Sequence, residues 1–185
     1  MEETSYQRIA ISGDPGSGKT TFARNVAKET GFELITTGNI FRELAREKGI
    51  TVTELNKMAE NQKDIDYKVD DFLISLNDKP GNYILDSRMA WHFVKGAFKI
   101  RLTVRPEVAV ERIFQDEADL REKFDSLEMA EQDIRQRRES EINRYRNLYG
   151  VDISAPNNFD LIIDTSDRSF TETLDVFLKA YSQAG

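Results

Sequence analysis

The residues best suited to chemistry lie near the N-terminus, where a glycine-rich segment follows a short apolar run. The segment 13–20 reads GDPGSGKT and matches the pattern G-x-x-x-x-G-K-S/T in full. Its glycines let the backbone wrap closely around a phosphate, and the N-terminus of a following helix adds positive potential. Lys19 can neutralise the β- and γ-phosphates of ATP, and the Thr20 hydroxyl can ligate Mg²⁺. The predicted ATP-binding residues are Gly13, Asp14, Pro15, Gly16, Ser17, Gly18, Lys19, Thr20 and Thr21.

Two arginines are placed to bind a second phosphate group. Arg42 lies on a predicted helix that begins just after Gly38, and Arg88 follows a predicted strand that ends in Asp86. The alternatives are a solvated surface role for Arg42 and a structural ion pair for Arg88. Asp86 could orient Mg²⁺-bound water or hold Arg88, and the sequence leaves both interpretations open.

Two further arginines lie on one long, highly charged predicted helix. Arg137 and Arg144 are seven residues apart, so their side chains project from the same helix face. Guanidinium groups that converge on a transferring phosphoryl group would stabilise its charge and hold its geometry. The alternative is an exposed helix with mixed charges, because glutamates are interleaved with the arginines.

A phosphate-binding loop does not name a reaction, and several classes of nucleotide-binding protein require motifs that this chain lacks. A GTPase needs Asn-Lys-x-Asp after a strand, whereas Asn56-Lys57 lies in a predicted helix and is followed by Met58-Ala59. Transport ATPases and helicases need larger domains and additional motifs. The arginine-rich second half of the chain favours a small kinase.

Composition excludes other classes of site. The chain has no cysteine and a single histidine, His92, which excludes disulfides, cysteine-ligated zinc and a multi-histidine metal centre. A net charge of −7 argues against binding nucleic acid through a basic face. No apolar run is long enough to span a bilayer, and the acidic N-terminal segment does not resemble a secretory signal. We therefore expect a cytoplasmic monomer without nucleic-acid or membrane partners.

The elements that must position these residues alternate between strands and helices. Strands are predicted at 8–12, 33–36, 83–86, 98–104 and 161–164. Helices are predicted at 19–30, 39–48, 107–117 and 127–149, with a mostly polar helical stretch over 53–76. Ser169 and Glu172 form a capping-box pair for a last helix, whose expected inward residues are Phe170, Leu174, Phe177, Leu178 and Tyr181.

This alternation predicts an α/β fold with a P-loop NTPase-type parallel sheet covered by helices on both faces. In such sheets, ligands bind beyond the carboxyl ends of the strands. We expect one domain over residues 1–185, with an acceptor-binding arm at about 38–77 and a lid at about 115–135. Both segments are polar, which suits parts that open and close.

Several segments together resemble the nucleoside monophosphate kinases, and in particular the compact archaeal-type cytidylate kinases. The resemblance covers nearly the whole chain. The segments that carry it are TTGNIFR at 36–42, DSR at 86–88, RPEVAVER at 105–112, RRESE at 137–141 with Arg144-Tyr145, YGVDI at 149–153 and DLIIDTS at 160–166.

The resemblance implies an Mg²⁺-dependent kinase that transfers the γ-phosphoryl group of ATP in line to CMP or dCMP. The residues implied to bind the acceptor are Thr37, Gly38, Arg42, Asp86 and Arg88. The residues implied to act in catalysis are Lys19, Arg88, Arg137 and Arg144, with Thr20 on the metal. Relatives often carry a basic residue just after Arg112; here Arg112 and Arg121 are the basic residues that could serve the lid.

Three alternatives to a CMP kinase remain open at this stage. The first is another nucleotide acceptor such as UMP or AMP, and the second is a small metabolite such as shikimate. The third is a non-catalytic protein that binds or senses nucleotides. The aromatic run Trp91-His92-Phe93 between two strands is expected to be structural, because phosphoryl transfer relies mainly on positioning and electrostatics.

Overall fold

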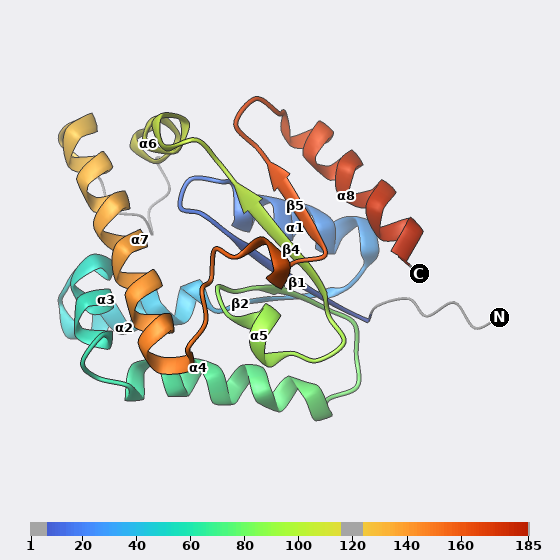
Figure 1. The fold of residues 1–185 in the computed structure, drawn as a ribbon, viewed down its shortest axis with the longest axis horizontal. Helices are drawn as coiled ribbons and strands as arrows, with labels where there is room; N and C mark the ends of the chain where they lie inside the picture. Colours follow the sequence, from blue (N-terminus) through green and yellow to red (C-terminus); the bar gives the residue numbers. More distant parts are fainter. Residues whose placement is uncertain (1–6, 116–123, 185) are drawn as a thin grey trace.

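Five parallel strands form one sheet with the order β2-β3-β1-β4-β5 in this computed structural model, which describes residues 7–115 and 124–184 (Figure 1). The strands are β1 (Arg8–Gly13), β2 (Glu33–Thr36), β3 (Tyr83–Asp86), β4 (Phe98–Thr103) and β5 (Leu161–Asp164). Every neighbouring pair in this order is parallel. The predicted α/β fold is confirmed, and the N-terminal strand β1 lies at the centre of the sheet.

The register of the strands brings the candidate site residues to one edge. Asp86, the last residue of β3, lies opposite Ile11 of β1 and Thr36 of β2. Parallel strands have their carboxyl ends at the same edge, where ligands bind in open α/β sheets. The segment after β1 and the segment after β2 therefore leave the sheet beside Asp86.

Alternating strand side chains build one core layer on the face that α1 (Lys19–Thr30) and α8 (Phe170–Ala184) cover (Figure 1). Ile9, Ile11 and Ile84 point into this layer and meet Phe22 of α1 and Phe177 of α8. The rings of Phe22 and Phe177 make an edge-to-face contact at 5.8 Å between their centroids. The prediction that Phe170 points inward is wrong, because this residue, in the first turn of α8, is 38% exposed.

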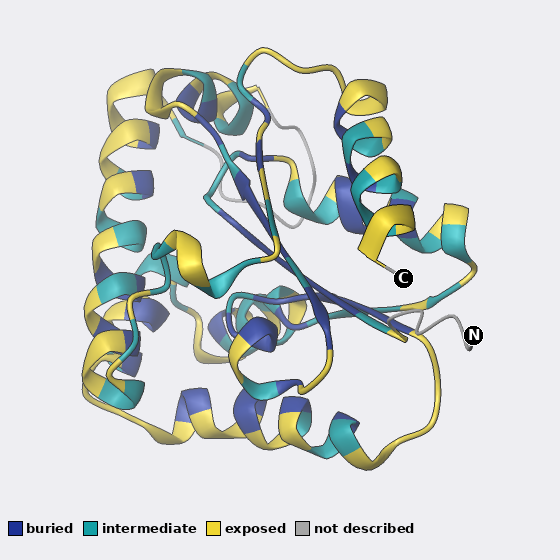
Figure 2. Cartoon of the chain, turned by 45° about the vertical axis from the view of Figure 1, so that its right-hand side comes forward, coloured by how far each residue is buried: buried dark blue, intermediate teal, exposed yellow. Residues whose placement is uncertain are grey.

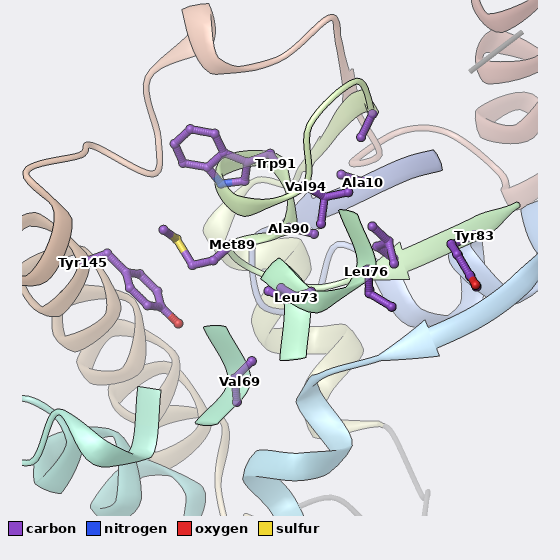
Figure 3. Close-up of a cluster of buried hydrophobic side chains, with 12 residues drawn as sticks. Ala10, Val69, Leu73, Leu76, Tyr83, Met89, Ala90, Trp91, Val94 and Tyr145 are labelled. Atoms are coloured by element: carbon purple, nitrogen blue, oxygen red, sulfur yellow. The ribbon is translucent and has the colours of Figure 1, made fainter. Parts of the chain in front are cut away.

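The opposite face of the sheet is covered by α4 (Asp64–Ser75), α5 (Ala90–Phe93) and α7 (Leu127–Tyr149). Ala10 and Leu85 point to this side and are fully buried. Figure 3 shows the side chains that fill this second layer, including Trp91 from α5 and Tyr145 from α7. Figure 2 shows that the strands between the two layers are mostly buried, as expected for a doubly covered parallel sheet.

The predicted acceptor arm has a small apolar cluster of its own. It contains α2 (Gly38–Lys48), α3 (Val52–Ala59) and the start of α4, and its buried members are Ala45, Leu55, Ala59 and Ile65. The helical stretch expected over 53–76 is interrupted, because α3 ends at Ala59 and α4 begins at Asp64. A capping box between Thr51 and Glu54 fixes the start of α3.

The remaining described elements are one helix and two 3₁₀ turns. Helix α6 (Pro106–Phe114) is shorter than the expected helix over 107–117, and the 3₁₀ turns η1 (Leu76–Asp78) and η2 (Pro156–Asn158) follow α4 and α7. Residues 116–123 of the predicted lid, including Arg121, lie outside the described residues. Within the described parts of the chain, no helix combines the length and apolar content needed to cross a membrane.

Candidate active site

The glycine-rich loop after β1 ends in an open helix N-terminus. Gly18 is the N-cap of α1 and has a φ of 78°, a conformation that favours glycine, and no side chain caps the first turn. Gly16 has a φ of 77°, and a Cβ there would lie 2.7 Å from the Cα of Ala109 in α6. The loop is thus shaped by glycine at both positions, and the helix presents its positive end to the space in front of it.

Asp86 brings the lysine and the threonine of this loop together. It is fully buried, forms an ion pair with the Lys19 ammonium, and accepts a hydrogen bond of 2.9 Å from the Thr20 hydroxyl. The sequence left open whether Asp86 orients Mg²⁺-bound water or holds Arg88. In the structure Asp86 bonds to Lys19 and Thr20, whereas Arg88 bonds to Glu141. The threonine hydroxyl and the aspartate carboxylate are oxygen ligands of the type that Mg²⁺ takes.

A single cleft of about 260 Å³ lies in front of the loop and extends to the arm and to α7. It is lined by most of the predicted site residues: Asp14, Pro15, Gly16, Gly18, Lys19, Thr20, Thr21, Thr37, Gly38, Arg42, Asp86, Arg88, Arg137 and Arg144. The two predicted residues that do not line it are Gly13, which lines a smaller neighbouring pocket, and Ser17, which is buried. The cleft therefore gathers the expected donor and acceptor residues in one place.

Arg88 is anchored at the base of the cleft. Its Nε donates to Glu141 Oε2 of α7 at 2.8 Å, and its Nη1 donates to the carbonyl of Gly13. The side chain is 21% exposed, so it keeps a face toward the cleft. The arginine thereby links the phosphate loop to α7 while remaining accessible to an anion.

Arg42 and Arg137 line the cleft from α2 and α7. Arg42 donates to Asn39 Oδ1 at 2.5 Å within α2. Arg137 Nη1 lies 3.6 Å from Asp133 Oδ2, one turn earlier on α7, and its buried Nε donates no hydrogen bond to residues 7–115 or 124–184. Asp133 also accepts a hydrogen bond from Thr53 of α3. The Arg137 guanidinium therefore retains donors that a bound phosphoryl group could take.

Arg144 is held much more tightly than its position on a charged helix suggests. It is 2% exposed, and its guanidinium donates to Asn56 Oδ1 at 2.7 Å and to the Tyr145 hydroxyl at 3.0 Å. It also lies over the rings of Phe41 and Tyr145, at 5.2 Å and 4.8 Å from their centroids. The Arg144 side chain thus ties α7 to the arm and lines the cleft from a buried position.

Arg112 of α6 bonds to the phosphate loop and to the segment after β5. It donates to the Thr165 carbonyl at 2.7 Å and to the Thr165 hydroxyl at 3.1 Å, and its Nη1 lies 3.4 Å from the Gly16 carbonyl. Arg112 also lines the cleft, so the start of the predicted lid begins beside the loop that is expected to hold ATP.

Several cleft residues were missed by sequence reasoning. Asp66 and Asp70 of α4 are 2% and 5% exposed and line the cleft together with Asn56, Glu141 and Tyr145. Burial raises the pKa of both aspartates to about 6; Arg144 opposes this rise in each, and for Asp70 so does a hydrogen bond from Tyr149. The available signal was the four-residue spacing of the two aspartates, which places them on one face of a helix otherwise read as polar.

The aromatic run is structural, as expected. Trp91 is 6% exposed, belongs to the core layer beside α4, and donates from its indole to the Arg88 carbonyl at 2.9 Å. The His92 ring contacts the rings of Trp91, Phe93 and Tyr149, and burial lowers the pKa of its imidazole. These contacts pack the helix that follows Arg88 against the end of α7.

The fold and this cleft define a P-loop phosphotransferase, in which a glycine-rich loop and a set of arginines line one cleft. The model of the cytidylate kinase-like family matches residues 8–167, so the chain belongs to that family. It is 36% identical to a cytidylate kinase from Archaeoglobus fulgidus over 94% of this chain and 93% of the relative. It is 40% identical to a cytidylate kinase from Pyrobaculum islandicum over 92% of this chain and 90% of the relative.

Other similarities extend the range of proteins that use this fold. The chain is 32% identical to an S-adenosylmethionine-dependent nucleotide dehydratase from Lacinutrix mariniflava, over 96% of this chain but only 36% of that longer protein. A shikimate kinase from Acinetobacter baumannii superimposes with a TM-score of 0.59 at 18% identity, covering 96% of this chain and 93% of that one. A gluconokinase from Sinorhizobium meliloti superimposes with a TM-score of 0.60 at 13% identity, covering 97% of this chain and 94% of that one. At such low identity, these two structures support the fold alone.

Proposed function

We propose that this enzyme transfers the γ-phosphoryl group of ATP to the 5′-phosphate of CMP or dCMP. The observation that supports this most strongly is the single cleft, in which the phosphate loop and the arm face each other with Arg42, Arg88 and Arg137 lining the space. The relatives named cytidylate kinase support a cytosine nucleotide as the acceptor.

In the proposed arrangement, the loop holds the donor phosphates through its backbone N–H groups and Lys19. Arg42 and Arg88, with Thr37 and Gly38 beside them, hold the acceptor phosphate. Arg137 stabilises the charge on the transferring group, and Arg144 adds positive potential from its buried position. An oxygen of the acceptor phosphate attacks the γ-phosphorus as the bond to the bridging oxygen of ADP breaks.

Mg²⁺ fits this site through the Thr20 hydroxyl and the Asp86 carboxylate, which already share a hydrogen bond of 2.9 Å. No group of three or more His, Cys, Asp or Glu side chains that could hold a metal occurs among residues 7–115 and 124–184. In this proposal the ion is bound mainly through nucleotide phosphates and water, as Mg²⁺ commonly is. When bound, the ion would neutralise charge on the β- and γ-phosphates.

The function is tested by measuring ADP release from Mg·ATP with CMP, dCMP, UMP, AMP and GMP in parallel. Turnover with CMP or dCMP well above the others is expected. Lys19→Ala should lower kcat by about 10²–10³-fold, because the lysine supplies charge that the transition state needs. Lys28→Ala, on the exposed face of the same helix, is the matched control and should retain activity. A Lys19→Ala enzyme with near-normal turnover would refute the proposed phosphate cradle.

Two alternative functions predict different results in the same assay. The P-loop kinase fold is shared with enzymes named for shikimate and for gluconate, so a small metabolite acceptor would show as ADP release with none of the nucleotides. A nucleotide sensor would bind ATP without any acceptor-dependent ADP release.

A further inference from the structure

Two buried aspartates of the cleft have no role in the proposed phosphoryl transfer. Asp66 and Asp70 lie one turn apart on α4 and line the same cleft as the phosphate loop. Both belong to the side of the cleft that α3, α4 and α7 enclose, where Asn56, Val69 and Tyr145 also lie. Lys19 forms an ion pair and Thr20 a hydrogen bond with a different carboxylate, that of Asp86 beside the phosphate loop.

The two carboxyl groups differ in how fully they are bonded. Asp70 accepts a hydrogen bond from the Tyr149 hydroxyl. Asp66 Oδ2 lies 3.3 Å from Arg144 Nε, yet this buried oxygen has no hydrogen bond from any described residue. The other guanidinium nitrogens of Arg144 are directed at Asn56 and Tyr145. Asp66 is therefore the acidic group on this wall that retains capacity to accept a hydrogen bond.

The surroundings of Asp66 suit a flat, partly apolar ring. Val69, one turn further along α4, lines the cleft with Met89 and Tyr145. Figure 3 shows these three side chains coming from α4, from the segment before α5 and from α7 toward the same region. Ligand sites that orient aromatic groups combine such apolar walls with a few polar groups. On this side of the cleft, Asp66 is such a polar group.

The charge state of Asp66 determines which base edge it complements. Burial raises the pKa of Asp66 to about 6, and the charge of Glu141 adds to this rise while that of Arg144 opposes it. Because a pKa of about 6 lies below pH 7.5, the carboxyl is largely ionised at that pH. An ionised carboxylate accepts hydrogen bonds and donates none. Cytosine and adenine present an amino group at the relevant position, whereas uracil and guanine present a carbonyl oxygen.

We propose that Asp66 accepts a hydrogen bond from the exocyclic amino group of the acceptor base and thereby selects cytosine over uracil. This rests on the proposed function, because it assigns the base-reading residue of the same acceptor site. Uracil would place its O4 against the carboxylate oxygen, leaving two acceptors facing each other. Mismatched pairs of this kind cost enough to change kcat/KM by about tenfold or more.

The test compares kcat/KM for CMP and UMP at pH 7.5 in three aspartate-to-asparagine variants of α4. Asp66→Asn should lower the CMP-to-UMP ratio by about tenfold or more, since the amide can donate to uracil O4. Asp71→Asn, on the exposed face of α4, is the matched control and should leave the ratio unchanged. Asp70→Asn should keep the ratio close to that of the wild type, because Tyr149 already occupies that carboxylate.

An acceptor without the amino group provides a second test that needs no variant. The wild-type enzyme should use 2-pyrimidinone ribonucleoside 5′-monophosphate about tenfold less well than CMP. In Asp66→Asn the difference in kcat/KM between CMP and this analogue should be smaller. Equal use of both acceptors by the wild type, an unchanged ratio in Asp66→Asn, or a larger change in Asp70→Asn would overturn the proposal.

These outcomes are separable from failure of the proposed function. A wild-type enzyme that turns over nucleotides with an unaltered CMP-to-UMP ratio in Asp66→Asn remains a nucleoside monophosphate kinase, and only the assignment of Asp66 fails. A wild-type enzyme that accepts no nucleoside monophosphate refutes both.

Discussion

At the scale of single residues, the buried carboxyl groups of α4 link the binding cleft to stability. Asp70 is 5% exposed, and burial raises its pKa from 3.8 to about 6 despite a hydrogen bond from Tyr149. Between these two values the folded protein binds more protons at this group than the unfolded chain does. Its contribution therefore makes the free energy of unfolding fall as the pH rises from about 4 to 6, and the loss persists above pH 6.

Asp70→Asn is expected to remove this contribution. The amide keeps an acceptor for the Tyr149 hydroxyl but carries no charge to desolvate, so the free energy of unfolding at pH 7 should rise by up to about 3 kcal/mol. At pH 4 the gain should be much smaller, because the wild-type carboxyl is then protonated in the folded state. Urea unfolding at both pH values measures the difference, with Asp71→Asn as control. A variant that is equally destabilised at both pH values would contradict this account.

At the scale of elements, one buried arginine connects β4 to the phosphate loop. Arg101 is 7% exposed in the middle of the sheet, and its Nη2 pairs with Asp14 Oδ1 of the loop at 2.9 Å. Its Nη1 donates to the Ile153 carbonyl at 2.5 Å, in the segment after α7. Arg138 of α7 lies 4.0 Å from the same Asp14 oxygen. The Arg101 guanidinium thus fixes the loop to the sheet. The sequence pattern predicts β4 only as a strand and does not indicate this role.

Arg101→Met is expected to weaken ATP binding by about tenfold. The substitution keeps an apolar side chain of similar length but removes a charge-assisted hydrogen bond to Asp14, which contributes about 1.5–3 kcal/mol. Titration calorimetry with ATP measures the affinity. The double variant Asp14→Asn with Arg101→Met should recover part of the loss, because no buried charge is then left without its partner. Unchanged ATP affinity in the single variant would show that the loop holds its shape without this pair.

Elements with strong end signals were predictable from the sequence, and contacts between distant elements were not. Helix α1 and helix α7 have the predicted bounds because Gly31 and Gly150 end them in the left-handed conformation. The break between α3 and α4 was missed because residues 60–63 contain neither proline nor glycine. The phosphate loop is contiguous and so could be recognised. The bond from Arg88 to Glu141 joins residues far apart in the sequence, which no local pattern encodes.

At the scale of the whole molecule, α2 and α3 share a small apolar cluster that meets the sheet core through Phe41 and through α4. The arm cluster contains Ala45, Leu55 and Ala59, whereas the sheet has its own two layers. Polar bonds join the arm to α7, among them Arg144 to Asn56 and Thr53 to Asp133. Because polar contacts can be exchanged more readily than a packed core, we expect α2 and α3 to move together when the acceptor binds.

Hydrogen exchange measures this movement. CMP at saturating concentration should slow amide exchange in α2 and α3 more than in β1 and β4, whose core is already closed. ATP alone should protect the phosphate loop and leave the arm nearly unchanged. Equal protection of the arm and the sheet by CMP would indicate that the molecule responds as one rigid body.

The central place of β1 also has a consequence for how the protein is made. Strand β1 pairs with β3 and β4, beginning at Tyr83 and Phe98, and not with β2, which follows it in the chain. The sheet therefore depends on contacts between distant segments, which form slowly and late. The whole segment from β1 to β4 must be synthesised before β1 can pair with both neighbours. The nascent chain must remain protected from aggregation until then.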